Sequence, residues 1–205
     1  MEDGNVITSD KEKADLLNGY FANQTRPPRN NIPLPPLSLI TDAKLQDITI
    51  NPTIVKKVLE NLNPNKANEP DGISNRILKE CASSLSGPLS IIFNKSLLLG
   101  VFPNTWKDGI VSSIFKKGDR QSKVNYRPIS LLSCTSKVFE RIVFNEMYQY
   151  FVSNNLLNAC NSGFKKNDST VNRLLAMLDS IYRGLEERKD VILILLDISK
   201  AFDKV

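Results

Sequence analysis

Apolar residues recur at helical spacing along most of the chain, and only short stretches show the pattern of a β-strand. Amphipathic helices are therefore predicted in the leader and in five later segments. The predicted helices cover residues 14–21, 52–62, 75–84, 89–99, 137–151 and 170–188. Two short stretches rich in apolar residues, 110–115 and 191–197, predict strands. This pattern alone describes a mixed, helix-rich domain.

Residues that start or stop helices sharpen these boundaries. Asn51 is predicted to cap the helix that opens with the next proline, and Thr170 is predicted to cap the last helix. Gly87 and Pro88 are expected to break the chain between the helices at 75–84 and 89–99, and Gly100 is expected to end the latter.

A proline-rich segment separates the leader from the rest of the chain. Residues 25–39 contain five prolines, which fix φ and remove backbone donors. We expect an extended linker or a strap laid over a surface. A ligand of the PxxP type is the less favoured alternative.

Composition and charge exclude several classes of function. The chain has 205 residues and no histidine, which removes Ser-His-Asp and Cys-His hydrolases and most zinc sites. The three cysteines lie far apart and indicate a reduced, intracellular protein. The start of the chain lacks the pattern of a signal peptide, and every apolar run is shorter than the ~18 residues that span a bilayer. The net charge of +5 is compatible with a polyanionic partner.

Positive charge is concentrated between Lys116 and Lys137. The cations there are Lys116, Lys117, Arg120, Lys123, Arg127 and Lys137, against the single acid Asp119. A solvated loop and a loop that grips phosphates are equally favoured by charge alone. Pro128 biases Arg127 to an extended backbone, which favours the phosphate-binding alternative. A second basic loop surrounds Lys165 and Lys166.

The last apolar run of the chain ends in a carboxylate. Six apolar residues, Val191–Leu196, lead directly into Asp197. Such a run is typical of a strand buried on both faces, and a charge at its tip is costly unless it is paired. Asp197 either caps the following turn or binds a metal ion at the mouth of an active site. The spacing by itself favours the cap.

Five blocks of sequence carry a resemblance to a known family. They are, in order, NPNKANEPDGISNRILKE, FNKSLLLGVFPNTWKDGIVSSIFKKGD, NYRPISLLSCTSKVFERIV, SGFKKNDST and ILLDISKAFDKV. Together they resemble successive blocks of the reverse transcriptases of non-LTR (LINE-type) retrotransposons. The resemblance covers residues ~45 to 205, and motifs in this order are hard to obtain by chance.

The resemblance implies a role for each residue that matches a family motif. Asp197 would be the first catalytic carboxylate and a ligand of Mg²⁺, with the main-chain oxygen of Ile198 as a second ligand. Ala201 and Phe202 would line the nucleotide pocket, where Phe202 excludes a ribose 2′-OH. Arg127 would bind the triphosphate of the incoming nucleotide.

Four lysines complete the implied set of contacts. Lys117 and Lys123 are weaker candidates for contact with the nucleotide or the template. Lys165 and Lys166 would contact template phosphates. Lys165 stands where arginine is more frequent in the family, which loses the bidentate fork.

Three other departures from the family pattern indicate drift. Glu69 stands where the family usually has glycine, Ser112-Ser113 where a proline is common, and Asn161 where glutamine is usual. The Asp-Asp pair that completes the two-metal site of the family has no counterpart among these 205 residues. Because one carboxylate cannot hold two ions, we expect this polypeptide alone to be inactive. Because the terminal strand would lack its palm partners and expose apolar edges, we also expect it to be poorly soluble.

The fold that the resemblance implies is α/β (α+β), with the fingers of a right-hand polymerase, an N-terminal helical extension and the first palm strand. The chain is expected to be truncated within the palm. The expected division is a leader with a proline-rich strap at 1–45, the helical extension at 46–108, fingers at 109–190 and the first palm strand at 191–205.

The implied partners are an RNA template, a DNA primer and deoxynucleotides, with Mg²⁺ as the cofactor and no membrane. The implied location is the nucleus or a cytoplasmic ribonucleoprotein. Two alternatives remain open: a non-catalytic RNA-binding module, and a decayed fragment of an element without function. The binding module would differ from the enzyme in two ways: its affinity for nucleic acid would fall steeply with salt, and Asp197→Ala would not change it.

Overall fold

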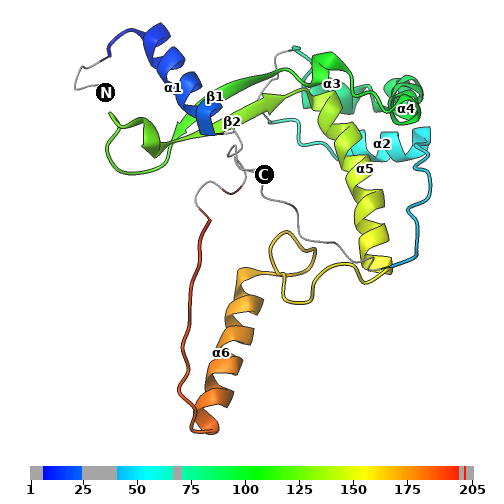
Figure 1. The fold of residues 1–205 in the computed structure, drawn as a ribbon. Helices are drawn as coiled ribbons and strands as arrows, with labels where there is room; N and C mark the ends of the chain where they lie inside the picture. Colours follow the sequence, from blue (N-terminus) through cyan, green and yellow to red (C-terminus); the bar gives the residue numbers. More distant parts are fainter. Residues whose placement is uncertain (1–6, 25–40, 67–70, 199–200, 202–205) are drawn as a thin grey trace.

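The computed structural model describes residues 7–24, 41–66, 71–198 and 201. Its elements in chain order are α1 (Asp10–Gln24), α2 (Pro52–Glu60), α3 (Asn75–Glu80), α4 (Ala82–Leu99), η1 (Asn104–Trp106), β1 (Gly109–Phe115), η2 (Lys123–Asn125), β2 (Tyr126–Leu132), α5 (Cys134–Ser153) and α6 (Thr170–Glu186). Helices α2 to α5 gather at one end of the β1–β2 ribbon, α1 lies across the other end, and α6 stands apart (Figure 1). The proline-rich segment and Phe202 lie outside the described residues.

The hydrophobic core lies among α2, α3, α4 and α5. Its members are Ile50, Val55, Leu59, Leu78, Ala82, Leu89, Phe93, Cys134, Val138, Phe139 and Ile142. Phe93 is fully buried, stacks on Phe139 at 5.0 Å and meets the edge of Trp106 at 5.9 Å. Phe102 contacts both Trp106 and Phe139. The segment before β1 is thus fastened to the core by its aromatic rings.

Asn94 of α4 ties the start of α2 to this core. Its side-chain oxygen accepts the Ile50 N–H at 2.8 Å, and its amide group donates to the Ile50 carbonyl at 2.7 Å. Asn51 then caps α2 by accepting the Ile54 N–H at 2.9 Å, and Pro52 occupies the first turn. The predicted cap of this helix is confirmed.

The prediction that Gly87 and Pro88 break the chain is wrong, because α4 runs through both residues. The interruption falls instead at Cys81, between α3 and α4. Buried positions at Ala82, Ser86, Leu89, Ser90 and Phe93 keep one face of α4 on the core on both sides of the proline. That packing offsets the ~3 kcal/mol that an interior proline costs.

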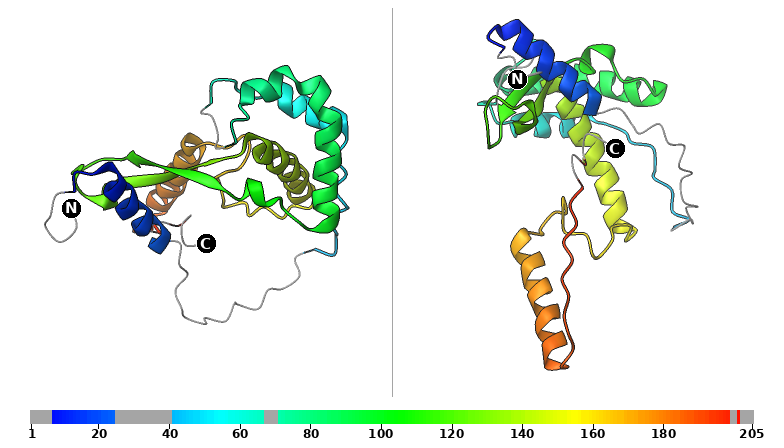
Figure 2. Two further views of the ribbon diagram at one scale, coloured as in Figure 1. Left: turned by 90° about the horizontal axis from the view of Figure 1, so that it is seen from above. Right: turned by 60° about the vertical axis from the view of Figure 1, so that its left-hand side comes forward.

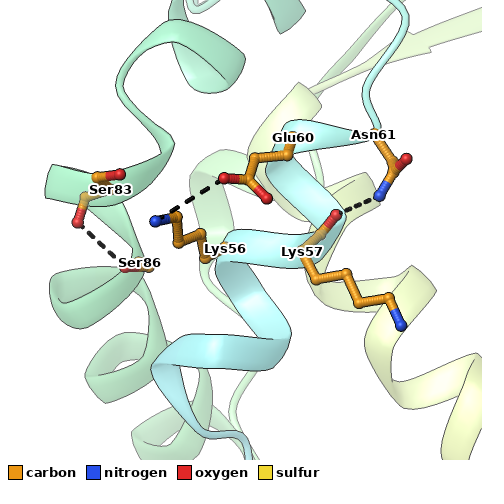
Figure 3. Close-up of polar contacts among 6 residues, drawn as sticks. All are labelled: Lys56, Lys57, Glu60, Asn61, Ser83 and Ser86. Carbon is orange, nitrogen blue, oxygen red and sulfur yellow. Dashed lines mark hydrogen bonds and ion pairs between the residues drawn. The ribbon is translucent and has the colours of Figure 1, made fainter.

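Hydroxyl groups supply local hydrogen bonds near the proline. Ser86 donates to the Ser83 carbonyl at 3.2 Å, and Ser90 donates to the Gly87 carbonyl at 2.8 Å. Figure 3 shows the first of these pairs beside α2. As predicted, Gly100 ends α4 in a left-handed conformation with φ of 62°, and the Val101 N–H returns to the Ser96 carbonyl.

Two other helix boundaries shift from their predicted positions. Helix α5 begins at Cys134, one turn earlier than expected, because the first turn is buried with the core. Helix α6 is capped by Ser169 rather than Thr170, with the Ser169 hydroxyl accepting the Asn172 N–H at 3.2 Å.

The first predicted strand is confirmed as β1, which pairs antiparallel with β2 so that Gly109 faces Leu132 and Phe115 faces Tyr126. The predicted terminal strand is wrong: residues 191–198 belong to no strand and run alongside α6 (Figure 2). A strand forms only with a partner, and the one described sheet consists of β1 and β2. The apolar residues of 191–196 are 41–91% exposed, and α6 buries none of its residues.

No helix within the described ranges is both long enough and apolar enough to cross a bilayer.

Truncating Phe93 tests the importance of the aromatic cluster. Phe93→Ala is expected to lower the free energy of unfolding by about 3–5 kcal/mol, because it leaves a cavity under Trp106 and Phe139. Urea unfolding followed by the fluorescence of Trp106, the single tryptophan, measures this change. Leu98→Ala, on the same helix but 85% exposed, is the control and should change stability by under about 0.5 kcal/mol. Equal effects of the two substitutions would contradict the assignment of the core.

Candidate active site

The loop that joins β1 to β2 is held in one shape by its own polar groups. The Lys116 N–H donates to the Asn125 carbonyl at 2.8 Å, and the Asn125 side chain donates to the Asp119 carbonyl at 2.9 Å. The Asp119 carboxylate accepts the Gln121 N–H at 2.9 Å. Gly118 has φ of 91°, and a Cβ there would lie 2.8 Å from the Asn125 amide nitrogen. The basic side chains of this loop therefore extend from an ordered backbone.

Arg127 lies on β2, opposite Ile114 of β1, and its side chain is exposed. Pro128 follows it in the strand and faces Ser113. Lys117 is also exposed, at the start of the loop. Pairing with β1 fixes the backbone of Arg127, so its guanidinium starts from a defined position on the ribbon.

Two other cations of the loop lie on aromatic rings. The sequence analysis did not predict these contacts. Arg120 lies 4.9 Å from the centre of the Phe115 ring, and the Tyr126 hydroxyl donates to the Arg120 carbonyl at 2.8 Å. Lys123 lies 5.9 Å from the centre of the Tyr20 ring of α1. Cation–π contacts at exposed sites are worth about 0.5–1 kcal/mol. The aromatic residues Phe115 and Tyr126 at the two ends of the basic loop were the available signal in the sequence.

Helix α1 and this loop line an open pocket of about 520 Å³. Lys13 and Leu17 of α1 face Arg120, Lys123 and Tyr126 across it. The leader helix thus covers part of the basic loop. Lys123, which the resemblance implies as a phosphate contact, lies under this cover.

The second basic loop is anchored on α5. The Lys166 N–H donates to the Tyr148 hydroxyl at 2.9 Å, and the Lys166 ammonium lies 4.9 Å from the centre of the same ring. Tyr148 stacks on Phe144 at 5.6 Å. Phe164 and Asn167 have positive φ, so Lys165 and Lys166 sit between two left-handed residues. A tightly turned backbone presents both lysines beside α5.

Asp168 connects this loop to the start of α6. The Ser169 N–H donates to its carboxylate at 2.7 Å and lowers the pKa of Asp168 below the usual 3.8. A hydrogen bond from the Ser162 side chain lowers this pKa further, with smaller contributions from Asn172 and Lys165. The charged carboxylate thus supports the loop that carries Lys165 and Lys166.

The terminal segment places Asp197 and Ile198 in solvent. Both residues are exposed on backbone outside any helix or strand, and Ala201 is half-buried. No ion pair in the described part joins Asp197 to Arg127. The structure thus orders the two basic loops, but it does not bring Asp197 into contact with them.

The described residues do not form a metal centre by themselves. Nowhere in the described part do three or more Asp, Glu, Cys or His side chains gather so that they could hold an ion. Asp197 is a single exposed carboxylate, and two-metal chemistry needs several oxygen ligands around both ions. These residues therefore do not fit a complete Mg²⁺ site.

Comparison with known proteins identifies the class to which this arrangement belongs. Residues 114–205, from β1 to the terminal segment, match the family model for reverse transcriptase (RNA-dependent DNA polymerase). The chain is 32% identical over 155 residues to a probable RNA-directed DNA polymerase from transposon X-element of Drosophila melanogaster. It is 29% identical over 152 residues to the RNA-directed DNA polymerase from mobile element jockey of the same species. It is 29% identical over 109 residues to the retrovirus-related Pol polyprotein from type-1 retrotransposable element R2 of Popillia japonica.

The chain therefore belongs to the reverse transcriptase family. Within that family it corresponds to a part of the RNA-directed DNA polymerase of a non-LTR retrotransposon. The matches cover 75%, 74% and 53% of this chain but only 17%, 17% and 15% of the three relatives, in the order given. The chain thus spans about a sixth of the length of the relatives.

The lowered pKa of Asp168 predicts the direction of a pH effect. Its carboxylate should stabilise the loop before α6 above pH 3.8, and this stabilisation should disappear as the pH falls through the lowered pKa. The amide signals of Ser169 and Asn172, followed by NMR from about pH 5 to about pH 2, report the transition. Asp168→Asn should remove it. A transition in the wild type at or above pH 3.8 would contradict the assignment.

Proposed function

We propose that this chain contributes the fingers and the first palm segment to an RNA-directed DNA polymerase. The observation that carries the proposal is the family match over residues 114–205, which contains both ordered basic loops and the terminal carboxylate. The proposed division assigns the fingers to residues 109–190, the first palm segment to residues 191–205 and a helical extension to residues 46–108. RNA template, DNA primer and deoxynucleotides are the proposed partners.

Arg127 is the proposed contact to the triphosphate of the incoming nucleotide. Its guanidinium carries a permanent charge and a planar fork of donors that matches two phosphate oxygens. Strand pairing with Ile114 and the restricted backbone before Pro128 reduce the entropy lost when this fork binds. Lys117 and Lys123 are proposed as secondary phosphate contacts, because a lysine offers a point charge without the fork.

Lys165 and Lys166 are proposed to contact the phosphates of the template. Both are held beside α5 by the turn between Phe164 and Asn167 and by the bond from Lys166 to Tyr148. An ordered loop with two adjacent cations suits a backbone that carries one negative charge per nucleotide.

Asp197 is proposed as one ligand of a divalent cation, with Mg²⁺ as the expected ion and the Ile198 carbonyl as a second ligand. Reverse transcriptases are nucleotidyltransferases that generally depend on a metal ion, which would stabilise the charge of the transferring phosphate. Ala201 and Phe202 are proposed to line the nucleotide pocket, where Phe202 would exclude a ribose 2′-OH by its bulk. Further ligands would have to come from outside the described residues.

Substitution of Arg127 tests the nucleotide contact. In a hybrid in which residues 41–205 replace the matching segment of the X-element polymerase, Arg127→Ala should raise KM for deoxynucleotides about 10–100-fold. Arg127→Lys should have a KM between those of the wild type and Arg127→Ala, because lysine keeps the charge but lacks the planar fork of donors. Steady-state primer extension on an RNA template measures both.

The matched control is Arg183→Ala. Arg183 is an exposed arginine on α6 whose side chain pairs with Asp179 at 2.9 Å. Its removal should leave KM unchanged. A control that raises KM as much as Arg127→Ala would show that the effect reflects general loss of positive charge.

Primer extension by the purified chain tests the role of Asp197. Because the described residues offer one carboxylate where two ions need several ligands, the chain of residues 1–205 should incorporate no nucleotide with Mg²⁺ present. Asp190→Ala is the control in the same exposed segment. Incorporation that is lost in Asp197→Ala and kept in Asp190→Ala would refute the expectation of inactivity while supporting Asp197 as a ligand.

A further inference from the structure

Helix α1 covers one side of the basic loop without joining the hydrophobic core. It lies across the loop end of the β1–β2 ribbon in Figure 1 and in the left view of Figure 2. Its one buried residue, Phe21, is not a member of the core cluster. Leu16, Leu17, Tyr20 and Gln24 are half-buried, and the rest of the helix is exposed. These positions share one face of the helix, so α1 is held through that face alone.

The strand register shows which face of the ribbon α1 covers. Ser113 of β1 and Tyr126 of β2 line the open pocket beneath the helix. Ser113 pairs with Pro128 and Tyr126 pairs with Phe115, so all four side chains lie on one face. Arg127 stands between Tyr126 and Pro128 in the strand, and its side chain therefore lies on the opposite face. Helix α1 thus leaves the face of the proposed nucleotide contact open.

Two cations of the basic loop lie on the covered side. Arg120 and Lys123 line the pocket with α1, and the Lys123 ammonium lies 5.9 Å from the centre of the Tyr20 ring. Lys13 of α1 lines the same pocket, but its ammonium pairs with Asp10 at 3.0 Å. The ring of Tyr20 therefore takes up a side of the Lys123 ammonium that a phosphate oxygen would otherwise approach.

The docking of α1 is weak enough for a polyanion to reverse it. An exposed cation–π contact contributes less than a hydrogen bond between an ammonium and a phosphate. The Gln24 amide nitrogen is buried without a hydrogen-bond partner among the described residues, which destabilises the docked helix. A helix of 15 residues is also marginal in water once it loses its tertiary contacts. Phosphates can therefore compete with α1 for Lys123.

We propose that α1 is an autoinhibitory cover, which must leave the basic loop before Arg120 and Lys123 can bind the backbone of a nucleic acid. The inference rests on the proposed function and adds a regulatory step to it. With α1 docked, the open face of the ribbon is the one that carries Arg127. When a nucleic acid displaces α1, Lys123 exchanges the ring of Tyr20 for phosphate oxygens.

Hydrogen exchange of the α1 amides measures the docking without any nucleic acid. In the purified chain of residues 1–205, Tyr20→Ala and Lys123→Ala should each speed this exchange at least about twofold, because each removes the cation–π contact. In the double variant the increase should be smaller than the product of the two single increases, since one contact is lost twice. Tyr20→Phe keeps the ring and should exchange like the wild type. Independent effects of the two substitutions would overturn the proposal.

Fluorescence anisotropy with a short, labelled, unstructured RNA tests whether the docked helix inhibits binding. Tyr20→Ala should bind this RNA about two- to fivefold more tightly than the wild type, because less free energy is needed to release α1. RNA added to the wild type should speed the exchange of the α1 amides, because the complex holds the helix away from the loop. Tyr182→Ala, the same substitution on an exposed position of α6, is the control and should change neither quantity.

The outcomes separate this inference from the proposed function. Unchanged or weaker RNA binding by Tyr20→Ala, or slower exchange of α1 when RNA is added, would overturn the cover, with Trp106 fluorescence confirming that the core is native. The effect of Arg127→Ala on primer extension tests the proposed function separately, because Arg127 lies on the face that α1 leaves open. Its absence would refute the nucleotide contact and would leave the coupling between Tyr20 and Lys123 in hydrogen exchange unaffected.

Discussion

The stacking of Phe93 on Phe139 is the contact on which the position of the β1–β2 ribbon depends. β1 begins shortly after Trp106, which packs against both rings, and β2 leads almost directly into α5, which carries Phe139. Both strands are thus attached to the same aromatic cluster at one end. The core thus fixes the direction of the ribbon, while the basic loop at its other end is held by its own hydrogen bonds and by the contact of Lys123 with Tyr20 of α1.

The proposed site has two parts, one attached to this core and one that is not. Arg127 lies on a strand fixed at the core, whereas Asp197 follows α6, a helix without a buried residue in the described structure. Helix α6 is amphipathic, yet its apolar residues and those of 191–196 are largely exposed. Residues close in sequence supply the helical pattern of α6 and its Ser169 cap, while the placement of the carboxylate requires packing that the described residues do not provide.

Local rules predicted much of the fold, and long-range contacts explain the misses. The Asn51 cap and the Gly100 stop depend on residues within a few positions of each other, and β1 pairs with the next strand along the chain. The run of α4 through Pro88 depends on burial against distant helices, and a terminal strand needs a partner that no local pattern supplies. The contact of Lys123 with Tyr20 joins segments far apart in sequence. Family resemblance named candidate residues, but it did not indicate this contact.

The pair of hydrogen bonds between Asn94 and Ile50 has a consequence for the order of folding. These residues are 44 positions apart, so the bonds close a long loop and cannot form early at low entropic cost. Helix α4 must first fix the Asn94 side chain, which then captures the chain just before α2. We expect α4 to belong to the folding nucleus and the docking of α2 to follow. Loss of Asn94 would then mainly accelerate unfolding and leave the rate of nucleation little changed.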